Sequence, residues 1–309
     1  MHLLIPFAAW PDPACQKSLP TLQLPVLTQL LTSMQASPLQ QQAPGELQLA
    51  HEHILAQSLG LPTPAPWAAL AAQPLGLATH DQVWGFLHPC HWEIGQAQVT
   101  LHNPEQLQLQ DDEARALLAA MQPYFAEDGL SLHYERADRW LVSGEPLRAV
   151  QGASLERMIG RNVAPWLPSA PWLRRLQNEM QMLLYTHPIN DARLARRLQP
   201  VNSFCLSAIG ALPDARSAGG AEPLMPLDLR GPALRQDWSS WQAAWQQLDA
   251  TQCRALLKVL QQGKPVRLSL CSENTAQTWS SPGHRSVLRR LIAPWRRPKP
   301  SAILATLCN

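Results

Sequence analysis

The sequence predicts a mixed protein of the α/β or α+β class, because strand-length apolar runs alternate along the chain with amphipathic helical patterns. Three runs have the length and apolar content of buried strands: His2–Phe7, Val201–Ile209 and Val266–Cys271. The clearest helical pattern places apolar residues on one face: Leu173, Leu176, Met180 and Leu183. The 29 prolines indicate many loops and interrupted helices between these elements.

Length and composition indicate a folded chain with one large domain over residues 1–309. The chain is 46% hydrophobic and 16% charged, against a usual charged share of about 25%, which excludes a disordered protein. No segment approaches the roughly 20 uninterrupted apolar residues of a membrane span. The N-terminus, MHLLIPFAAWPDP, lacks the basic region and cleavage site of a signal peptide, and the six cysteines form no C-x-x-C pair. We therefore expect reduced thiols, a cytoplasmic location and no membrane association.

Local signals in the first half of the chain place its elements in order. Pro25 opens a helix, the Pro- and Gln-rich stretch 36–49 is expected to be a surface loop, and a helix over 51–59 ends at Gly60. An inserted subregion is expected to follow at about 61–150. Its expected strands are 83–87, 97–101, 130–134 and 139–143. Its expected helix starts at the acidic residues 111–113 and stops before Pro123.

The second half continues the alternation of helices and strands. The amphipathic helix at 173–183 is followed by a short Arg-rich helix and by the strand at 201–209. The Gly-, Pro- and Ala-rich stretch 211–233 is expected to be a linker or long loop. Two further helices, over 238–248 and 250–261, precede the last predicted strand.

The charge of the chain is unevenly distributed. All 23 acidic residues lie at or before Glu273, so residues 1–273 carry 19 − 23 = −4, and the last 36 residues carry +6. A basic segment at 284–309 could contact nucleic acid or an acidic partner. Apolar residues recur within it at helical spacing, at 287, 288, 291 and 292. We expect a docked amphipathic helix with an Arg-rich outer face, since the acidic remainder suits phosphate backbones poorly.

The stretch Leu184–Gly210 carries a family resemblance. It reads LYTHPINDARLARRLQPVNSFCLSAIG and resembles the HP-x-N-x-x-R … P-x-N-x-x-W-x-x-G-x-G block of archaeal-type cofactor-independent phosphoglycerate mutases, in the alkaline phosphatase superfamily. The matching residues are His187, Pro188, Asn190, Arg193, Pro200, Asn202 and Gly210. Weaker matches occur in the expected order at 24–31 and 50–62. The chain resembles still more closely a bacterial offshoot of that group, the regulatory RpfE-type proteins.

The resemblance implies a reduced alkaline-phosphatase-like fold, an α/β domain with a doubly wound, mostly parallel sheet and with helical and loop insertions. Sites in such folds lie at the carboxyl ends of the strands. The family transfers a phosphoryl group through a phosphoserine, with two divalent metals that hold the nucleophile and the phosphate oxygens.

The sequence departs from the family where the chemistry takes place. The first strand runs into Pro6-Phe7-Ala8-Ala9 in place of the family's metal-binding Asp-Gly, His51 stands where the family has its nucleophilic Ser, and no Asp-His pair occurs anywhere. Two divalent ions need anionic and imidazole ligands. We therefore expect no metal-binding residues and no cofactor, with a divalent metal only if this interpretation of the site is wrong.

Five residues remain as candidates for chemistry. His51 at a helix start could meet an anion or accept a phosphoryl group as a catalytic residue, or it could belong to an ordinary polar first turn. His187, Asn190, Arg193 and Asn202 could bind a ligand, because Arg and Asn suit phosphate or carboxylate oxygens. Asn190 and Asn202 could instead brace the helix between them.

Three functions follow from these observations. The first is a phosphoglycerate-mutase-like protein that has lost binuclear metal catalysis and acts as a regulatory or binding protein, with a small phosphorylated metabolite or an unknown protein as its partner. The second is a residual phosphomutase or phosphatase that works through His51 on a small phosphorylated metabolite. The third is a nucleic-acid-associated factor that uses the basic tail.

Overall fold

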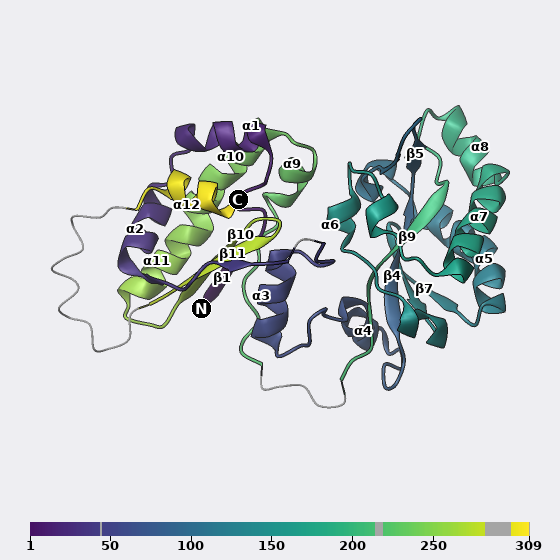
Figure 1. The fold of residues 1–309 in the computed structure, drawn as a ribbon, viewed down its shortest axis with the longest axis horizontal. Helices are drawn as coiled ribbons and strands as arrows, with labels where there is room; N and C mark the ends of the chain where they lie inside the picture. Colours follow the sequence, from purple (N-terminus) through teal and green to yellow (C-terminus); the bar gives the residue numbers. More distant parts are fainter. Residues whose placement is uncertain (44, 214–218, 282–297, 309) are drawn as a thin grey trace. The chain divides into compact units, whose positions relative to one another are not determined.

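The chain forms two compact units in a computed structural model, which describes residues 1–43, 45–213, 219–281 and 298–308 (Figure 1). Unit 1 comprises Met1–Gly60 and Ser217–Asn309, and unit 2 comprises Leu61–Arg216. Unit 2 thus begins where the predicted insertion begins and extends beyond its expected end at residue 150. Each unit has its own sheet and its own apolar core.

The sheet of unit 1 is mixed. Its strands are β1 (His2–Ile5), β10 (Arg267–Cys271), β11 (Thr275–Ser280), β2 (Gln35–Ala36) and β3 (Gln40–Gln41). β1 pairs with β10 in parallel, whereas β11 pairs antiparallel with β10, β2 and β3. Only residues 272–274 connect β10 to β11, and so short a connection permits only antiparallel neighbours.

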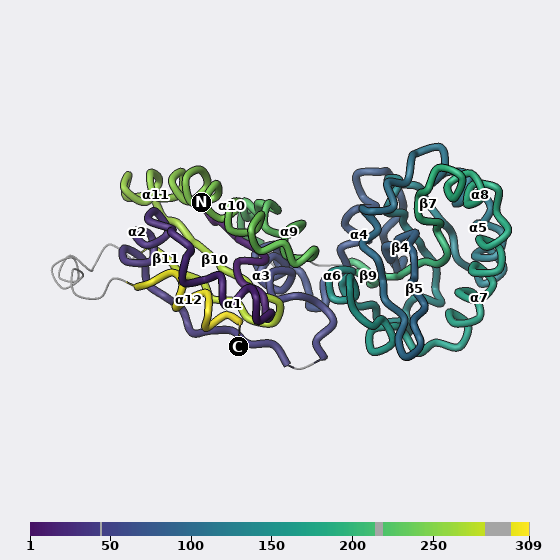
Figure 2. Tube along the Cα trace, turned by 90° about the horizontal axis from the view of Figure 1, so that it is seen from above, coloured from purple at the N-terminus to yellow at the C-terminus, as the bar shows by residue number. Residues whose placement is uncertain are grey.

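Helices cover both faces of this sheet (Figures 1 and 2). The helices of unit 1 are α1 (Pro13–Ser18), α2 (Pro25–Ser33), α3 (Ala50–Leu59), α9 (Arg230–Leu234), α10 (Trp238–Leu248), α11 (Arg254–Gln261) and α12 (Pro300–Leu307), with a 3-10 turn at Leu19–Thr21. On one face, Leu3, Ile5 and the β10 leucines join the core formed with α1, α2, α10, α11 and α12. On the other face, Leu4 packs with Ala50 and Ile54 of α3. Because successive side chains of β1 point to opposite faces of the sheet, β1 contributes apolar residues to the packing on each face.

The two helices predicted at 238–248 and 250–261 form one continuous helical segment. A π-helical turn, Asp249–Cys253, joins α10 to α11. The Asp249 side chain is buried, and it accepts hydrogen bonds from the backbone N–H groups of Val26 (3.1 Å) and Leu27 (2.7 Å) at the start of α2. The N-cap residue of α2, Leu24, cannot supply this acceptor. Asp249 therefore caps a helix more than 200 residues away in the sequence.

Unit 2 is built on an antiparallel sheet with the strand order β7-β8-β4-β9. These strands are β4 (Trp84–Cys90), β7 (Ser131–Arg136), β8 (Arg139–Ser143) and β9 (Ser203–Gly210), and a separate hairpin joins β5 (Trp92–Ile94) to β6 (Val99–Leu101). The helices are α4 (Trp67–Ala72), α5 (Asp111–Glu127), α6 (Leu155–Met158), α7 (Pro171–Tyr185) and α8 (Pro188–Ala195). Short 3-10 turns occur at Gln73–Leu75, Pro104–Leu107, Glu145–Ala149 and Ala164–Trp166. α5 and α7 pack on one face of the sheet and α4 on the other.

The expectation of a doubly wound, mostly parallel sheet is wrong. The protein is of the mixed α/β type, but its sheets are mostly antiparallel, and β1–β10 is the one parallel pair among the named strands of the described residues. β7 and β8 are joined through two residues, 137 and 138, which is a hairpin connection rather than a helical crossover. Strand patterns alone do not reveal which strands pair.

α5 continues through Pro123, where the sequence predicted its end. Pro123 and Ala119, the residue whose carbonyl loses its helical partner, are both exposed, so water can satisfy that carbonyl. Met121 and Phe125 on either side of the proline are buried in the core of unit 2. Burial of these two side chains holds the helix together across the missing hydrogen bond.

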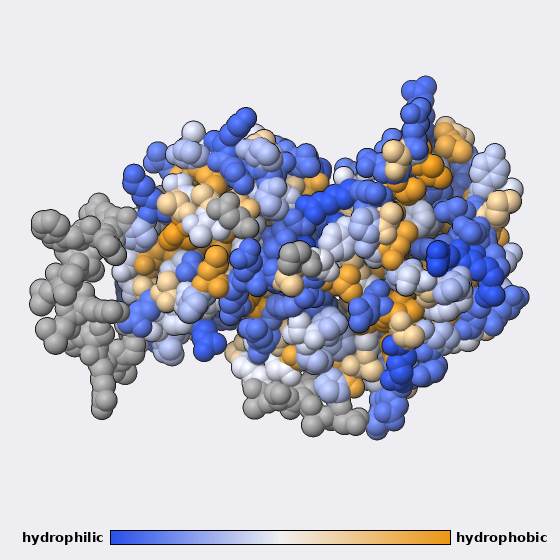
Figure 3. Space-filling view, viewed as in Figure 1, coloured by the Kyte–Doolittle hydropathy of each residue, from blue (hydrophilic) through white to orange (hydrophobic). Residues whose placement is uncertain are grey.

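Several further expectations concern the surface and the chain ends. Of the predicted basic segment 284–309, residues 284–297 and 309 lie outside the described residues, and the rest includes α12. The cytoplasmic location stays a prediction. Every helix in the described part of the chain is too short or too polar to cross a bilayer. All six cysteines are buried free thiols. The visible face of each unit is largely hydrophilic with scattered apolar patches, as on ordinary protein surfaces (Figure 3).

Candidate functional site

His51 lies in the first turn of α3 in unit 1. Its side chain is only 8% exposed, and its ring packs against that of Phe7 at a centroid distance of 5.4 Å. Phe7 in turn stacks on Trp10. The imidazole predicted as a catalytic group therefore lies against an aromatic cluster, which is the environment of a packing residue.

The end of β1 is where the resemblance would place a metal-binding carboxylate. The carbonyl groups of Phe7 and Ala8 instead accept hydrogen bonds from the indole N–H groups of Trp241 (2.9 Å) and Trp245 (3.0 Å). The nearby Asp12 caps α1, accepting hydrogen bonds from Ala14 N (2.8 Å) and Cys15 N (3.1 Å). The donor groups at this strand end thus do not fit a pair of divalent metals.

No group of three His, Cys, Asp or Glu side chains that could hold a metal ion occurs among the residues that the structure describes. The family's binuclear centre needs more ligands than that. We therefore derive no catalytic step through a metal.

The two asparagines of the 184–210 motif, Asn190 and Asn202, lie in unit 2 and form hydrogen bonds with backbone groups. The Asn190 side chain is buried; its amide nitrogen donates to the carbonyls of Leu184 and Val201, both at 2.7 Å, and its oxygen accepts from Val201 N at 2.9 Å. The Asn202 amide pairs with both backbone groups of Trp92, at 2.7 and 2.9 Å. The Asn190 contacts link the residues on either side of α8, whereas the Asn202 contacts link the chain before β9 to β5. A ligand-binding role for either residue stays a prediction.

Other motif residues also have structural contacts. His187 is the N-cap of α8, and its Nδ1 accepts a hydrogen bond from the N–H of Ile189 at 3.3 Å. A Cβ atom at Gly210 would lie 2.9 Å from Cβ of Pro66. Close packing therefore requires glycine at position 210.

Arg193 has a wholly buried side chain at the centre of a polar cluster. Its guanidinium donates to Glu113 (2.6 Å), to the carbonyl of Gln199 (2.9 Å) and to the carbonyl of Leu107. Glu113 also accepts from Arg196 and from the backbone N–H of Gln110 at the start of α5. Arg193 thus ties α8 to α5, and its fork already has three protein acceptors.

The charge state of Glu113 reflects this cluster. Burial raises the pKa of Glu113, but the N–H of Gln110 and the guanidinium groups of Arg196 and Arg193 outweigh that effect and hold the pKa below its ordinary value. The carboxylate is therefore ionised at neutral pH and available to pair with both arginines. Arg193 stands out in the sequence through the motif, whereas Glu113, 80 positions away, carries no sequence signal of this contact.

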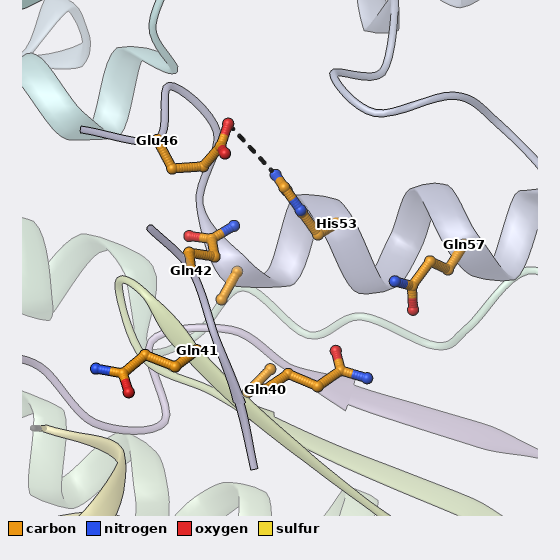
Figure 4. Close-up of a pocket in the computed structure, with 8 residues that line it drawn as sticks. Gln40, Gln41, Gln42, Glu46, His53 and Gln57 are labelled. Atoms are coloured by element: carbon orange, nitrogen blue, oxygen red, sulfur yellow. Dashed lines mark ion pairs between the residues drawn. The ribbon is translucent and has the colours of Figure 1, made fainter. Parts of the chain in front are cut away.

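A pocket of about 180 Å³, lined mostly by residues with polar side chains, lies between β3 and α3 in unit 1 (Figure 4). His53, Ala50 and Gln57 project from one face of α3, as expected from their spacing. His53 Nε2 lies 3.8 Å from Glu46 Oε1. Sequence analysis treated residues 36–49 as a loop and did not identify this site. The lining residues are Gln40, Gln41, Gln42, Glu46, Ala50, His53, Gln57 and Ala276.

Comparison with known proteins gives only distant structural likenesses. No family model and no curated protein matches the sequence. The chain is similar, at 12% identity and a TM-score of 0.37, to a cofactor-independent phosphoglycerate mutase from Thermoplasma acidophilum DSM 1728, with 100% of this chain and 99% of that chain covered. It is also similar to the PH0037 protein from Pyrococcus horikoshii at 12% identity and a TM-score of 0.46, with 91% and 87% covered. The chain thus has a distant structural resemblance to a cofactor-independent phosphoglycerate mutase.

Proposed function

We propose that this protein is a phosphoglycerate-mutase-like protein of the RpfE type that acts by binding, in a regulatory role, rather than by metal-dependent phosphoryl transfer. The observation that carries the proposal is the end of β1, where two tryptophan indoles occupy the Phe7 and Ala8 carbonyls and Asp12 caps α1. The polar groups at this strand end are thus engaged in contacts that hold the fold.

A turnover assay on the full chain tests this proposal. We expect no hydrolysis of p-nitrophenyl phosphate and no conversion of 3-phosphoglycerate above background, with or without added Mn²⁺. Elemental analysis of the purified protein should find less than one tightly held Mn or Zn ion per chain. Two such ions, or turnover, would contradict the proposal.

The variant His51→Gln separates binding from residual catalysis through the imidazole. Glutamine retains much of the side-chain volume against Phe7 but cannot accept a phosphoryl group on a ring nitrogen. The matched control is His80→Gln, since the His80 side chain is 80% exposed. Turnover that is present in the wild type and the control but lost in His51→Gln would establish a phosphomutase or phosphatase instead.

A further inference from the structure

The pocket between β3 and α3 has walls that backbone hydrogen bonds hold in place. β3 pairs with β11, Gln42 N donates to Asn274 O at 2.9 Å, and Ala50 N donates to Glu273 O at 3.0 Å. α3 itself is capped at both ends. The Glu52 side chain accepts a hydrogen bond from Leu49 N at its start, and Gly60 adopts the left-handed C-cap conformation at its end. The shape of the pocket therefore does not depend on its glutamine side chains.

Three of the lining amides are free to bind a ligand. Within the described part of the chain, the side chains of Gln40, Gln41 and Gln57 make no hydrogen bond, and all three residues are exposed. Each amide offers two N–H donors and one carbonyl acceptor. In Figure 4, Gln41 extends away from the other labelled side chains, so Gln40 and Gln57 are the better candidates.

The charge of the lining selects against phosphate. Glu46 contributes a carboxylate, and no lysine or arginine is among the lining residues that the structure describes. His53 lies beside that carboxylate, so any positive charge on the ring is offset locally. A phosphate group would meet a like charge without a compensating guanidinium, whereas hydroxyl groups can donate to Glu46 and exchange hydrogen bonds with the amides.

The size of the pocket limits the ligand further. A volume of about 180 Å³ is below the roughly 300–1,000 Å³ of pockets for drug-sized ligands, but it is ample for several water molecules. No Phe, Tyr or Trp is among the lining residues that the structure describes, so hydrogen bonding rather than stacking on a large ring would determine the specificity. The arrangement suits a molecule of about the size of a monosaccharide.

From the convergence of Gln40, Gln57 and Glu46 on one small pocket, we infer that unit 1 binds an uncharged, hydroxyl-rich small molecule of the monosaccharide or cyclitol class. This inference rests on the proposed binding function and names the ligand class for it. It differs from the sequence-based expectation of a phosphorylated metabolite.

Ligand-detected NMR on the full chain tests the inference with D-glucose, D-ribose and myo-inositol as probes, and with glucose 6-phosphate and ribose 5-phosphate as their charged counterparts. We expect at least one neutral probe to bind, and to bind more tightly than its phosphate. Gln57→Ala should weaken that binding about five- to tenfold, the effect of losing one ligand hydrogen bond. The control Gln246→Ala makes the same change at an exposed position of α10, and should leave binding unchanged.

The variant Glu46→Gln tests the role of the negative charge in the pocket. It removes the carboxylate and should reduce the preference for the neutral sugar over its phosphate. Three results would overturn the inference: no neutral probe binds, the phosphate binds more tightly, or Gln57→Ala binds like the control. None of these results bears on catalysis, so the proposed function is tested separately, by the turnover assay and by elemental analysis.

Discussion

Removal of the buried Arg193 side chain tests whether the motif at 184–210 holds the fold or binds a ligand. In Arg193→Ala, the Glu113 carboxylate loses its buried partner, and two backbone carbonyls lose their donor. Breaking a buried ion pair by deleting one partner typically destabilises a protein by about 3–5 kcal/mol. We expect a loss in this range, a large part of a typical stability of about 5–15 kcal/mol.

Two variants make this expectation specific. Arg193→Lys keeps the charge but not the planar fork, so it should lose stability to an intermediate extent. Arg196→Ala removes the other guanidinium that contacts Glu113, but the Arg196 side chain is 52% exposed, so its loss should be under about 1 kcal/mol. The control thus separates the effect of burial from the effect of charge.

Chemical denaturation followed by circular dichroism measures these differences, and hydrogen exchange assigns them to unit 2. The reasoning is refuted if Arg193→Ala unfolds at the same denaturant concentration as the wild type. It is also refuted if Arg196→Ala is the more destabilised of the two. A stable Arg193→Ala that no longer bound a phosphorylated metabolite would restore a ligand-binding role for this residue.

Three further predictions concern single side chains. Asn190→Ala should lower the free energy of unfolding by about 2–3 kcal/mol in a denaturant titration, because three hydrogen bonds to buried backbone groups are lost. Gly144→Ala should lower the melting temperature of unit 2, because the new Cβ would lie 2.4 Å from the carbonyl oxygen of Gly129. The control Gly160→Ala should lower the melting temperature less, because no atom lies within 4 Å of the Cβ that it adds. Burial raises the pKa of Asp249 above its ordinary 3.8, so the folded state binds its proton more tightly than the unfolded state. Its contribution to stability should therefore decrease as pH rises from 3.8 through the raised pKa, and Asp249→Asn should lack this pH dependence in thermal melts.

Much of the secondary structure could be predicted from local patterns. Several elements occur near their predicted positions: the strand at the N-terminus, the helix that ends at Gly60, and strands β7 and β8 of unit 2. Gly60 adopts the left-handed conformation that a C-cap requires. The helix through Pro123 was not predictable in the same way, since it depends on core contacts of its neighbours.

The candidate site could be predicted only in part. The resemblance drew attention to Asn190 and Arg193, but residue type did not distinguish a ligand contact from a structural one. Their hydrogen-bond partners, Val201 and Glu113, became visible only in the folded chain. The pocket between β3 and α3 had no sequence signal, because exposed glutamines occur in many surface loops.

The sequence by itself determined the mixed class of the fold, the approximate order of helices and strands, and the absence of a carboxylate at the end of the first strand. These properties depend on residue type and short-range periodicity. Only the tertiary structure decided which strands pair, that the sheets are mostly antiparallel, and that Asp249 caps α2. Strand pairing and burial depend on contacts between residues far apart in the chain, and local patterns carry no information about such contacts.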